Sequence, residues 1–161
     1  MSHMKLAVVG YGLVRGREPE LAYLAENNDV RIIGYYKRSK MHESGITNSK
    51  RLQLVYLDVK PVLLVDPFFL FRHEVGCSSW VYFQNLEKHL RDREIIITHE
   101  LWPFFSYQST RISKGLNKKV VAIVFENITR NPFFSFIPPY SHNSRYVAKN
   151  ADLFIAQTRK A

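Results

Sequence analysis

Cysteine is nearly missing from this chain, which has only Cys77 among its 161 residues. A single thiol excludes an intramolecular disulfide framework and any zinc site built from a cysteine cluster. No nucleophile signature surrounds Cys77, so we expect a buried thiol. The histidines are scattered without H-x3-H or HExxH spacing, so we expect no metal site. They are His3, His42, His73, His89, His99 and His142.

Long hydrophobic runs are missing too. No stretch of about 18 apolar residues exists, so the sequence predicts no membrane-spanning helix. Lys5 is followed by only four apolar residues before Gly10, too few for the core of a signal peptide. We expect residues 1–3 to be an expression scar ahead of Met4, and residues 4–161 to form a single domain.

Acidic residues are outnumbered by basic ones. The chain has 23 Lys and Arg against 14 Asp and Glu, for a formal net charge of +9 and a pI of about 9.7. Such an excess suits nucleic acid, an anionic membrane surface or a phosphorylated ligand, or it is only a solvated surface. The basic residues gather between 31 and 51, with Glu43 as the one acidic residue there. The chain has no zinc finger, RNA-recognition signature or compact Lys/Arg run, so we expect no nucleic acid partner.

Short apolar runs predict strands, and apolar residues at helical spacing predict helices between them. The predicted strands are Lys5–Val9, Val30–Tyr36, Glu94–Thr98, Lys119–Phe125 and Asp152–Ala156. The predicted helices are Glu18–Asn27, Ser78–Arg91, Phe104–Leu116 and Ser141–Asn150, with Ser141 as an N-cap. Two more apolar runs, Leu52–Leu57 and Val62–Val65, are sheet strands or irregular segments, and Lys37–Lys50 is predicted to be a mobile loop.

The alternation of strands and helices favours an α/β fold. We expect a doubly wound, mostly parallel Rossmann-like sheet with helices on both faces. Hydrophobic residues make up 46% of the chain, which is enough to fill such a core. Ligands of doubly wound folds bind at the carboxyl ends of the strands, so the residues directly after each strand are the candidates.

The first candidate is the glycine turn Gly10-Tyr11-Gly12 after the first strand. A dinucleotide fingerprint, G-x-G-x-x-G, needs a third glycine where this chain has Arg15, and Gly16 comes one position late. The acidic ribose-binding residue after the second strand is absent, and the sequence YKRS at 36–39 suits a 2′-phosphate instead. The turn therefore indicates an NADP-binding domain, a simple tight turn, or room for a sugar acceptor.

Polar pairs follow two other predicted strands. His99 and Glu100 come directly after the EIIIT strand, where such a pair can bind a sugar hydroxyl or move a proton. The alternative is a histidine that only makes structural hydrogen bonds. Glu126 and Asn127 follow the KVVAIVF strand and would reach the same crevice, unless Asn127 only forms a turn. No G-x-S-x-G or P-loop sequence supports a serine hydrolase or an NTPase.

Two aromatic segments, Asp66–Arg72 and Asn131–Tyr140, are unusually apolar for loops. Each is predicted either to pack on the core or to contact a ligand. The second would suit a lid, a contact between domains, or a hydrophobic dock for a lipid acceptor.

The order of these motifs resembles the N-terminal half of GT-B glycosyltransferases of family four, the retaining group that includes glycogen synthases and mannosyltransferases. The resemblance rests on the glycine turn at Gly10, the strand and loop Ile95–Pro103, the strand region Lys118–Asn127, and the closing segment Ser144–Thr158. The last looks like the family's helix, Ala-Asp, strand and Ser/Thr sequence, and the resemblance covers most of the chain.

The resemblance implies two Rossmann-like domains around a cleft. The first binds a saccharide or lipid-linked acceptor. The second holds a nucleotide-sugar through its own E-x7-E segment, and that second domain would be absent from this chain. This chain would be the first domain, inactive alone, with no cofactor or metal of its own. The implied catalytic residue is His99, although Glu126-Asn127 stands where many members carry a histidine. The candidate substrate-binding residues are Gly10, Gly12, Glu100, Glu126 and Asn127.

The resemblance also implies a cytoplasmic enzyme that associates with the membrane, because many members act on lipid-linked acceptors and the chain is basic and aromatic. Two alternatives stay open. One is an NADP-binding Rossmann domain of an oxidoreductase, and the other is a basic, non-enzymatic binding module for anionic surfaces.

Overall fold

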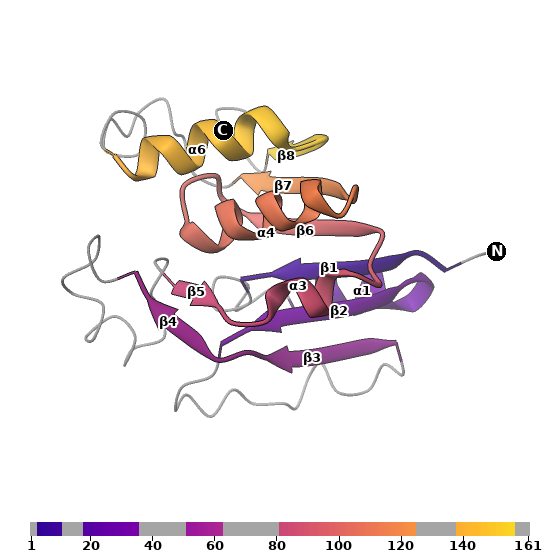
Figure 1. Ribbon diagram of the computed structural model, residues 1–161. Coiled ribbons are helices and arrows are strands. Elements are labelled where there is room, and N and C mark those ends of the chain that lie inside the picture. Colours follow the sequence, from indigo (N-terminus) through magenta and orange to yellow (C-terminus); the bar gives the residue numbers. More distant parts are fainter. Residues whose placement is uncertain (1–2, 11–17, 36–50, 63–80, 125–137, 157–161) are drawn as a thin grey trace.

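The computed structural model describes residues 3–10, 18–35, 51–62, 81–124 and 138–156, which form a six-stranded sheet with helices packed on it (Figure 1). All six strands are parallel, in the order β3-β2-β1-β6-β7-β8. The strands are β1 (Lys5–Val9), β2 (Asp29–Gly34), β3 (Leu52–Tyr56), β6 (Ile95–His99), β7 (Lys119–Val124) and β8 (Leu153–Ala156). The helices are α1 (Glu18–Asn27), α3 (Leu86–Leu90), α4 (Phe104–Gly115) and α6 (Tyr140–Asn150).

The strand order confirms the doubly wound fold predicted from the sequence. The chain first winds outward from β1 to β3, then returns to the other side of β1 and winds outward again from β6 to β8. The direction of winding therefore reverses between β1 and β6. In open α/β sheets, ligands bind in the crevice at such a switch point, at the carboxyl ends of the strands.

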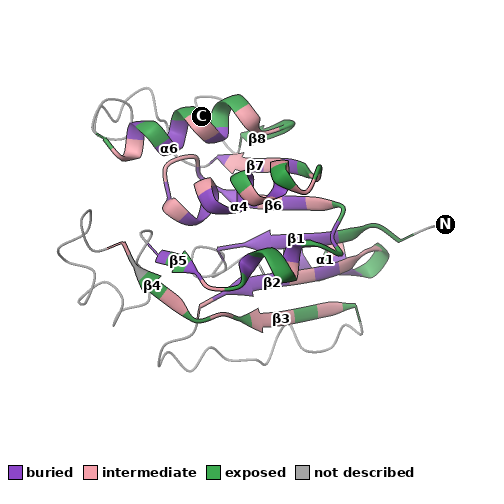
Figure 2. Ribbon diagram, viewed as in Figure 1, coloured by how far each residue is buried: buried purple, intermediate pink, exposed green. Residues whose placement is uncertain are grey.

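Both faces of the central strand are buried, which explains its unbroken apolar sequence. Leu6 and Val8 pack in one cluster with Leu21 and Ala25 of α1. Ala7 and Val9 point to the other face, where they pack with residues of α3 and α4, among them Phe105. Helices thus cover both faces, as the sequence predicts, and Figure 2 shows the buried residues concentrated on β1, β2 and β6.

The predicted helix Ser78–Arg91 is wrong in its first half. Within the described residues of that range, the structure has β5 (Val81–Phe83), which pairs antiparallel with β4 (Val59–Pro61), followed by the short α3. Val81 and Phe83 are buried while Tyr82 between them is exposed, so the local period is two rather than 3.6. Asn85, with φ of 57°, then turns the chain into α3.

Other boundaries differ by a residue or two. The strand predicted as Glu94–Thr98 is Ile95–His99, so His99 pairs with Ile123 as the last residue of β6. Ser141 is not the N-cap of its helix, because α6 begins at Tyr140 after Pro139 and Ser141 is buried inside it. The run Leu52–Leu57 contains the sheet strand β3.

Several predicted features lie outside the described residues. They are Cys77, the loop Lys37–Lys50, the segment Asp66–Arg72 and nearly all of Val62–Val65 and Asn131–Tyr140. Within the described ranges, no helix is both long and apolar enough to cross a membrane, and no group of three or more His, Cys, Asp or Glu is placed to hold a metal ion.

Candidate functional site

The switch point brings three of the predicted candidates, Gly10, His99 and Glu100, to one edge of the sheet. Val9 of β1 lies opposite Thr98 of β6 in the parallel register, so Gly10 and His99 follow at neighbouring strand ends. The Gly10 N–H donates to the Ile33 carbonyl at 2.9 Å, which extends the pairing with β2 by one residue. Gly10, His99 and Glu100 therefore lie at one edge of the sheet. Gly12, Glu126 and Asn127 lie outside the described residues.

Gly10 is required by the packing of α4. Its φ is +96°, a left-handed conformation that side chains rarely adopt. A Cβ added there would overlap Cε2 of Phe105 and lie 2.8 Å from Cζ of the same ring. The absence of a side chain lets Phe105 pack directly against the backbone at the end of β1. This contact explains the glycine whether or not a ligand also approaches the turn.

His99 is held firmly at the end of β6. Its side chain is only 2% exposed. Its carbonyl oxygen accepts a hydrogen bond from Oγ of Ser106 at 2.8 Å, and the same Oγ accepts from Oγ1 of Thr98 at 2.8 Å. Because side chains alternate along a strand, Thr98 faces α4 and His99 faces the opposite side of the sheet. The Thr98 and Ser106 hydroxyls thus fix the backbone from which the imidazole projects.

Glu100 combines burial with an uncommon backbone conformation. Its φ is 59°, which is costly for a residue with a long side chain, and only 5% of it is exposed. Its N–H donates to the Ile123 carbonyl at 2.8 Å, which ties the turn to β7. The surrounding structure therefore holds a carboxyl-bearing residue in a conformation that an unconstrained chain avoids. Such strain concentrates at functional sites, and here it falls on the residue after His99.

The loop after Glu100 is anchored to α6. Nδ2 of Asn143 donates to the Trp102 carbonyl at 3.0 Å, and the Trp102 ring lies 5.9 Å from the Tyr140 ring, centroid to centroid. Pro103 is the N-cap of α4, whose first turn consequently lies at the carboxyl edge. The unpaired N–H groups of a helix start give that edge a partial positive charge, which favours anionic or electron-rich ligand groups.

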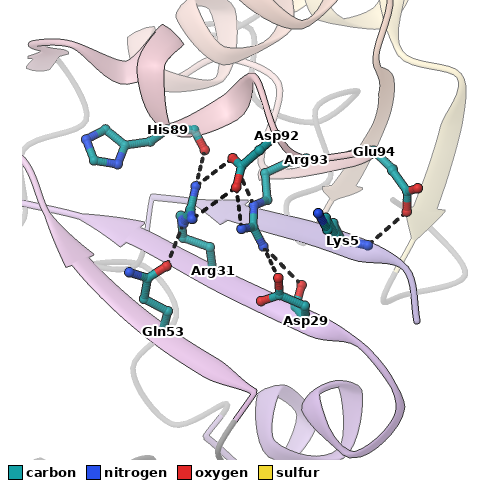
Figure 3. A network of polar contacts seen from close by, with 8 residues as sticks. All are labelled: Lys5, Asp29, Arg31, Gln53, His89, Asp92, Arg93 and Glu94. Atoms are coloured by element: carbon teal, nitrogen blue, oxygen red, sulfur yellow. Dashed lines mark hydrogen bonds and ion pairs between the residues drawn. The ribbon is translucent and has the colours of Figure 1, made fainter. Parts of the chain in front are cut away.

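The opposite, amino edge of the sheet carries an ionic network that the sequence reasoning missed (Figure 3). Arg93, with a side chain only 4% exposed, lies 2.9 Å from a carboxylate oxygen of Asp29 and 2.7 Å from one of Asp92. Arg31 also contacts Asp92, at 2.8 Å, and donates to the His89 carbonyl at 2.9 Å. Hydrogen bonds from Arg93 and then Arg31 hold the pKa of Asp92 well below its usual range.

Comparison with known proteins finds likeness in structure only. No protein-family model and no curated protein matches the chain. A UDP-N-acetylglucosamine 4-epimerase from Methanobrevibacter ruminantium M1, in complex with UDP-N-acetylmuramic acid, has a TM-score of 0.56 and 17% identity, over 96% of this chain and 54% of that one. Arabidopsis thaliana UGT89C1, complexed with UDP, has a TM-score of 0.57 and 11% identity, over 98% of this chain and 43% of that one.

The chain thus spans about half the length of these two structures. At such low identities the likeness concerns the fold and does not assign a family. Together with the strand order, it identifies the chain as an α/β protein of the Rossmann-like class.

Proposed function

We propose that the chain is the acceptor-binding N-terminal domain of a GT-B glycosyltransferase, of the family-four type. The enzyme transfers a sugar from a nucleotide-sugar to a saccharide or lipid-linked acceptor. The observation that carries the proposal is the placement of the Gly10 turn beside His99 and Glu100 at the switch point of the sheet. In this fold class, that position is where a ligand meets the protein.

The two structural neighbours support the nucleotide-sugar part of the proposal. One was solved with UDP and the other with a UDP-linked sugar. Both are about twice as long as this chain. We propose that the donor occupies a second domain of the complete enzyme, so that this chain alone does not transfer sugar, because it supplies only part of the contacts to the transition state.

The edge residues take distinct roles in this proposal. The imidazole of His99 holds a hydroxyl of the transferred sugar, and that bond assists transfer only if it strengthens as charge develops. His99 is only 2% exposed, so this role requires the sugar to reach an almost fully buried imidazole. Glu100 orients the loop, and the turn with Gly10 and Gly12 leaves space for the acceptor. Glu126 and Asn127 are proposed to contact the acceptor as well.

The excess of basic residues fits a peripheral enzyme on the cytoplasmic face of a membrane. Each Lys or Arg near an anionic surface contributes about 1 kcal/mol of attraction. The formal charge of +9 therefore favours association with anionic lipids, and we propose that the acceptor lies on the same membrane. No metal or cofactor takes part in this scheme.

A second candidate function, an NADP-binding oxidoreductase domain, is favoured by one observation. The strand order, with three strands on either side of the switch point, is also the order of dinucleotide-binding folds. Against it stand Arg15 in place of the third glycine and the lack of an acidic residue after β2.

Calorimetric titration of the chain with NADPH distinguishes the two functions. We expect no saturable binding, because Arg15 stands in place of the third glycine, which lets the helix pack closely against the strand in a dinucleotide site. Saturable binding with a micromolar Kd, about −8 kcal/mol, would overturn the transferase proposal in favour of the oxidoreductase. NADH is the control, because binding of NADPH alone would identify the basic segment at 36–39 as the 2′-phosphate site.

A further inference from the structure

A groove runs along the outer side of α4, beside α3 and β5. One part has a volume of about 470 Å³ and an adjoining part about 510 Å³, and the two share Tyr82, Glu87, Gln108 and Ile112 in their walls. Both volumes fall in the range of small-molecule sites. Gly10, His99 and Glu100 do not line it, so the groove is separate from the switch-point edge.

One end of the groove is aromatic. Tyr82 is 46% exposed, and its ring lies 6.4 Å from that of Phe104, which in turn lies 5.7 Å from that of Tyr107. The rings are tilted by 48° and 47°, so they do not form a parallel slot into which a planar base would slide. The Tyr107 ring also lies 5.5 Å from the His142 ring and 4.8 Å from the Tyr146 ring. The exposed Tyr82 is therefore the ring that the apolar side of a sugar could cover.

The same part of the groove also has two charged residues in its walls, Arg111 and Glu87. Arg111 lies one helical turn after Tyr107 on the same face of α4 and is exposed. Among the described residues it forms no ion pair. Glu87 accepts a hydrogen bond from Arg91 at 2.8 Å and keeps part of its carboxylate exposed. The groove therefore presents a guanidinium to an anion and a carboxylate to hydroxyl groups.

The walls of the groove are fixed before any ligand binds. Oε1 of the buried Gln108 accepts from the Phe83 N–H at 2.9 Å, and Nε2 donates to the Phe83 carbonyl at 2.8 Å. This pair of bonds locks β5, and with it Tyr82, onto α4. A preformed site loses less free energy to ordering when it binds a ligand.

We propose that this groove binds a saccharide that carries an anionic group. The sugar ring covers the exposed face of Tyr82, the anionic group pairs with Arg111, and a hydroxyl donates to Glu87. The anion is a phosphate or a carboxylate, since a guanidinium pairs with either. The site goes beyond the proposed transfer reaction and does not depend on it.

NMR titration of the amide resonances of the chain tests the proposal with glucose 1-phosphate, glucuronate and glucose. We expect the resonances of the groove, around Tyr82 and Arg111, to shift with at least one anionic sugar, at a Kd near 1 mM, and about tenfold more weakly with glucose. Comparison of the two anionic sugars shows whether phosphate or carboxylate is preferred.

Two variants and two matched controls sharpen the result. Arg111→Ala should reduce the affinity for the anionic sugar about tenfold, to that of glucose, and Tyr82→Ala should weaken all three sugars. The controls Arg145→Ala, on α6, and Tyr23→Ala, on α1, remove exposed side chains of the same types elsewhere and should change nothing.

The proposal is overturned if neither anionic sugar shifts the groove resonances, or if the controls weaken binding as much as the groove variants. It is also overturned if uridine monophosphate occupies the groove more tightly than both anionic sugars, because the ligand would then be a nucleotide. None of these outcomes bears on NADPH binding, so failure here is distinguishable from failure of the transferase proposal.

Discussion

At the amino edge of the parallel sheet, the starts of neighbouring strands are joined by charged side chains. Arg93 bridges the start of β2 through Asp29, and Glu94 accepts from the Lys5 N–H at 2.9 Å. At the far end of the same edge, Asp152 contacts Nζ of Lys114 at 2.8 Å and the Val120 N–H at 2.9 Å. These charges satisfy one another within the fold.

The carboxyl edge is built differently. Gly10 and Glu100 both have positive φ, and His99 and Glu100 are almost fully buried. The conformational cost of that edge is offset by packing around it, such as the Phe105 ring on Gly10. At the amino edge, the positive φ before β7 falls on Asn117, a residue type that adopts this conformation readily, whereas the carboxyl edge imposes it on Glu100. A long side chain held in such a conformation is the pattern expected of a ligand site.

The largest expected effect is at the carboxyl edge. Gly10→Ala adds a methyl group into the Phe105 ring at a left-handed φ, so we expect a loss of about 3 kcal/mol or more in the free energy of unfolding. Urea denaturation measures it. The matched control is Gly115→Ala at the end of α4, where an added Cβ meets nothing within 4 Å and we expect no loss. Equal effects at both glycines would contradict the packing role of Gly10.

The amino edge should be the next most sensitive. Arg93→Met keeps most of the buried volume but removes the bonds to Asp29 and Asp92, so we expect a loss of about 2 kcal/mol. The two carboxylates remain partly in water, which limits the cost. The control Arg91→Met removes an exposed pair with Glu87 and should cost about 0.5 kcal/mol or less. If Arg91→Met costs as much as Arg93→Met, the buried network is not a main source of stability.

Lowering the pH should destabilise the amino edge as the carboxylate of Asp152 becomes protonated. The hydrogen bond from Lys114, and next that from the Val120 N–H, lower the pKa of Asp152 to about 2. A carboxyl whose folded pKa is lowered stabilises the fold above its unfolded pKa, near 4, and loses that contribution as the pH falls through about 2.

Asp152→Asn should therefore destabilise the chain by about 1 kcal/mol at pH 7, and the difference from the wild type should shrink toward pH 2. Urea denaturation across this pH range measures it. Asp58→Asn, at an exposed aspartate between β3 and β4, is the control and should show no such convergence. A gap that stays constant with pH would mean that the Asp152 charge is not what stabilises the edge.

Local sequence was enough to predict most of the fold. The bounds of β1 and α1 match their predictions because an apolar run ends at a glycine and a helical period ends at consecutive asparagines. The helix predicted for Ser78–Arg91 was wrong in its first half, because four apolar residues of the segment lie at helical intervals by chance. They are Val81, Tyr82, Leu86 and Leu90. Its strand half is fixed by contacts with β4 and Gln108, which are distant in the sequence.

The candidate site was predictable only in part. A general rule about strand ends correctly grouped Gly10 with His99, because both follow strands that meet at the switch point. The Phe105 contact, the burial of His99 and the left-handed Glu100 depend on packing and leave no local signal. Nor does the amino-edge network, in which Arg31 and Asp92 are 61 residues apart.

The most direct test of the account is to map where a sugar acceptor touches the chain. Octyl glucoside, kept below its micelle concentration, serves as a mimic of a lipid-linked saccharide, and amide NMR follows each strand end separately. We expect saturable shifts at Gly10 and smaller ones at its neighbours His99 and Glu100, and none at Asp29, Glu94 or Asp152. Shifts confined to the amino edge, or an unperturbed carboxyl edge at saturating ligand, would contradict the claim that the carboxyl edge binds the acceptor.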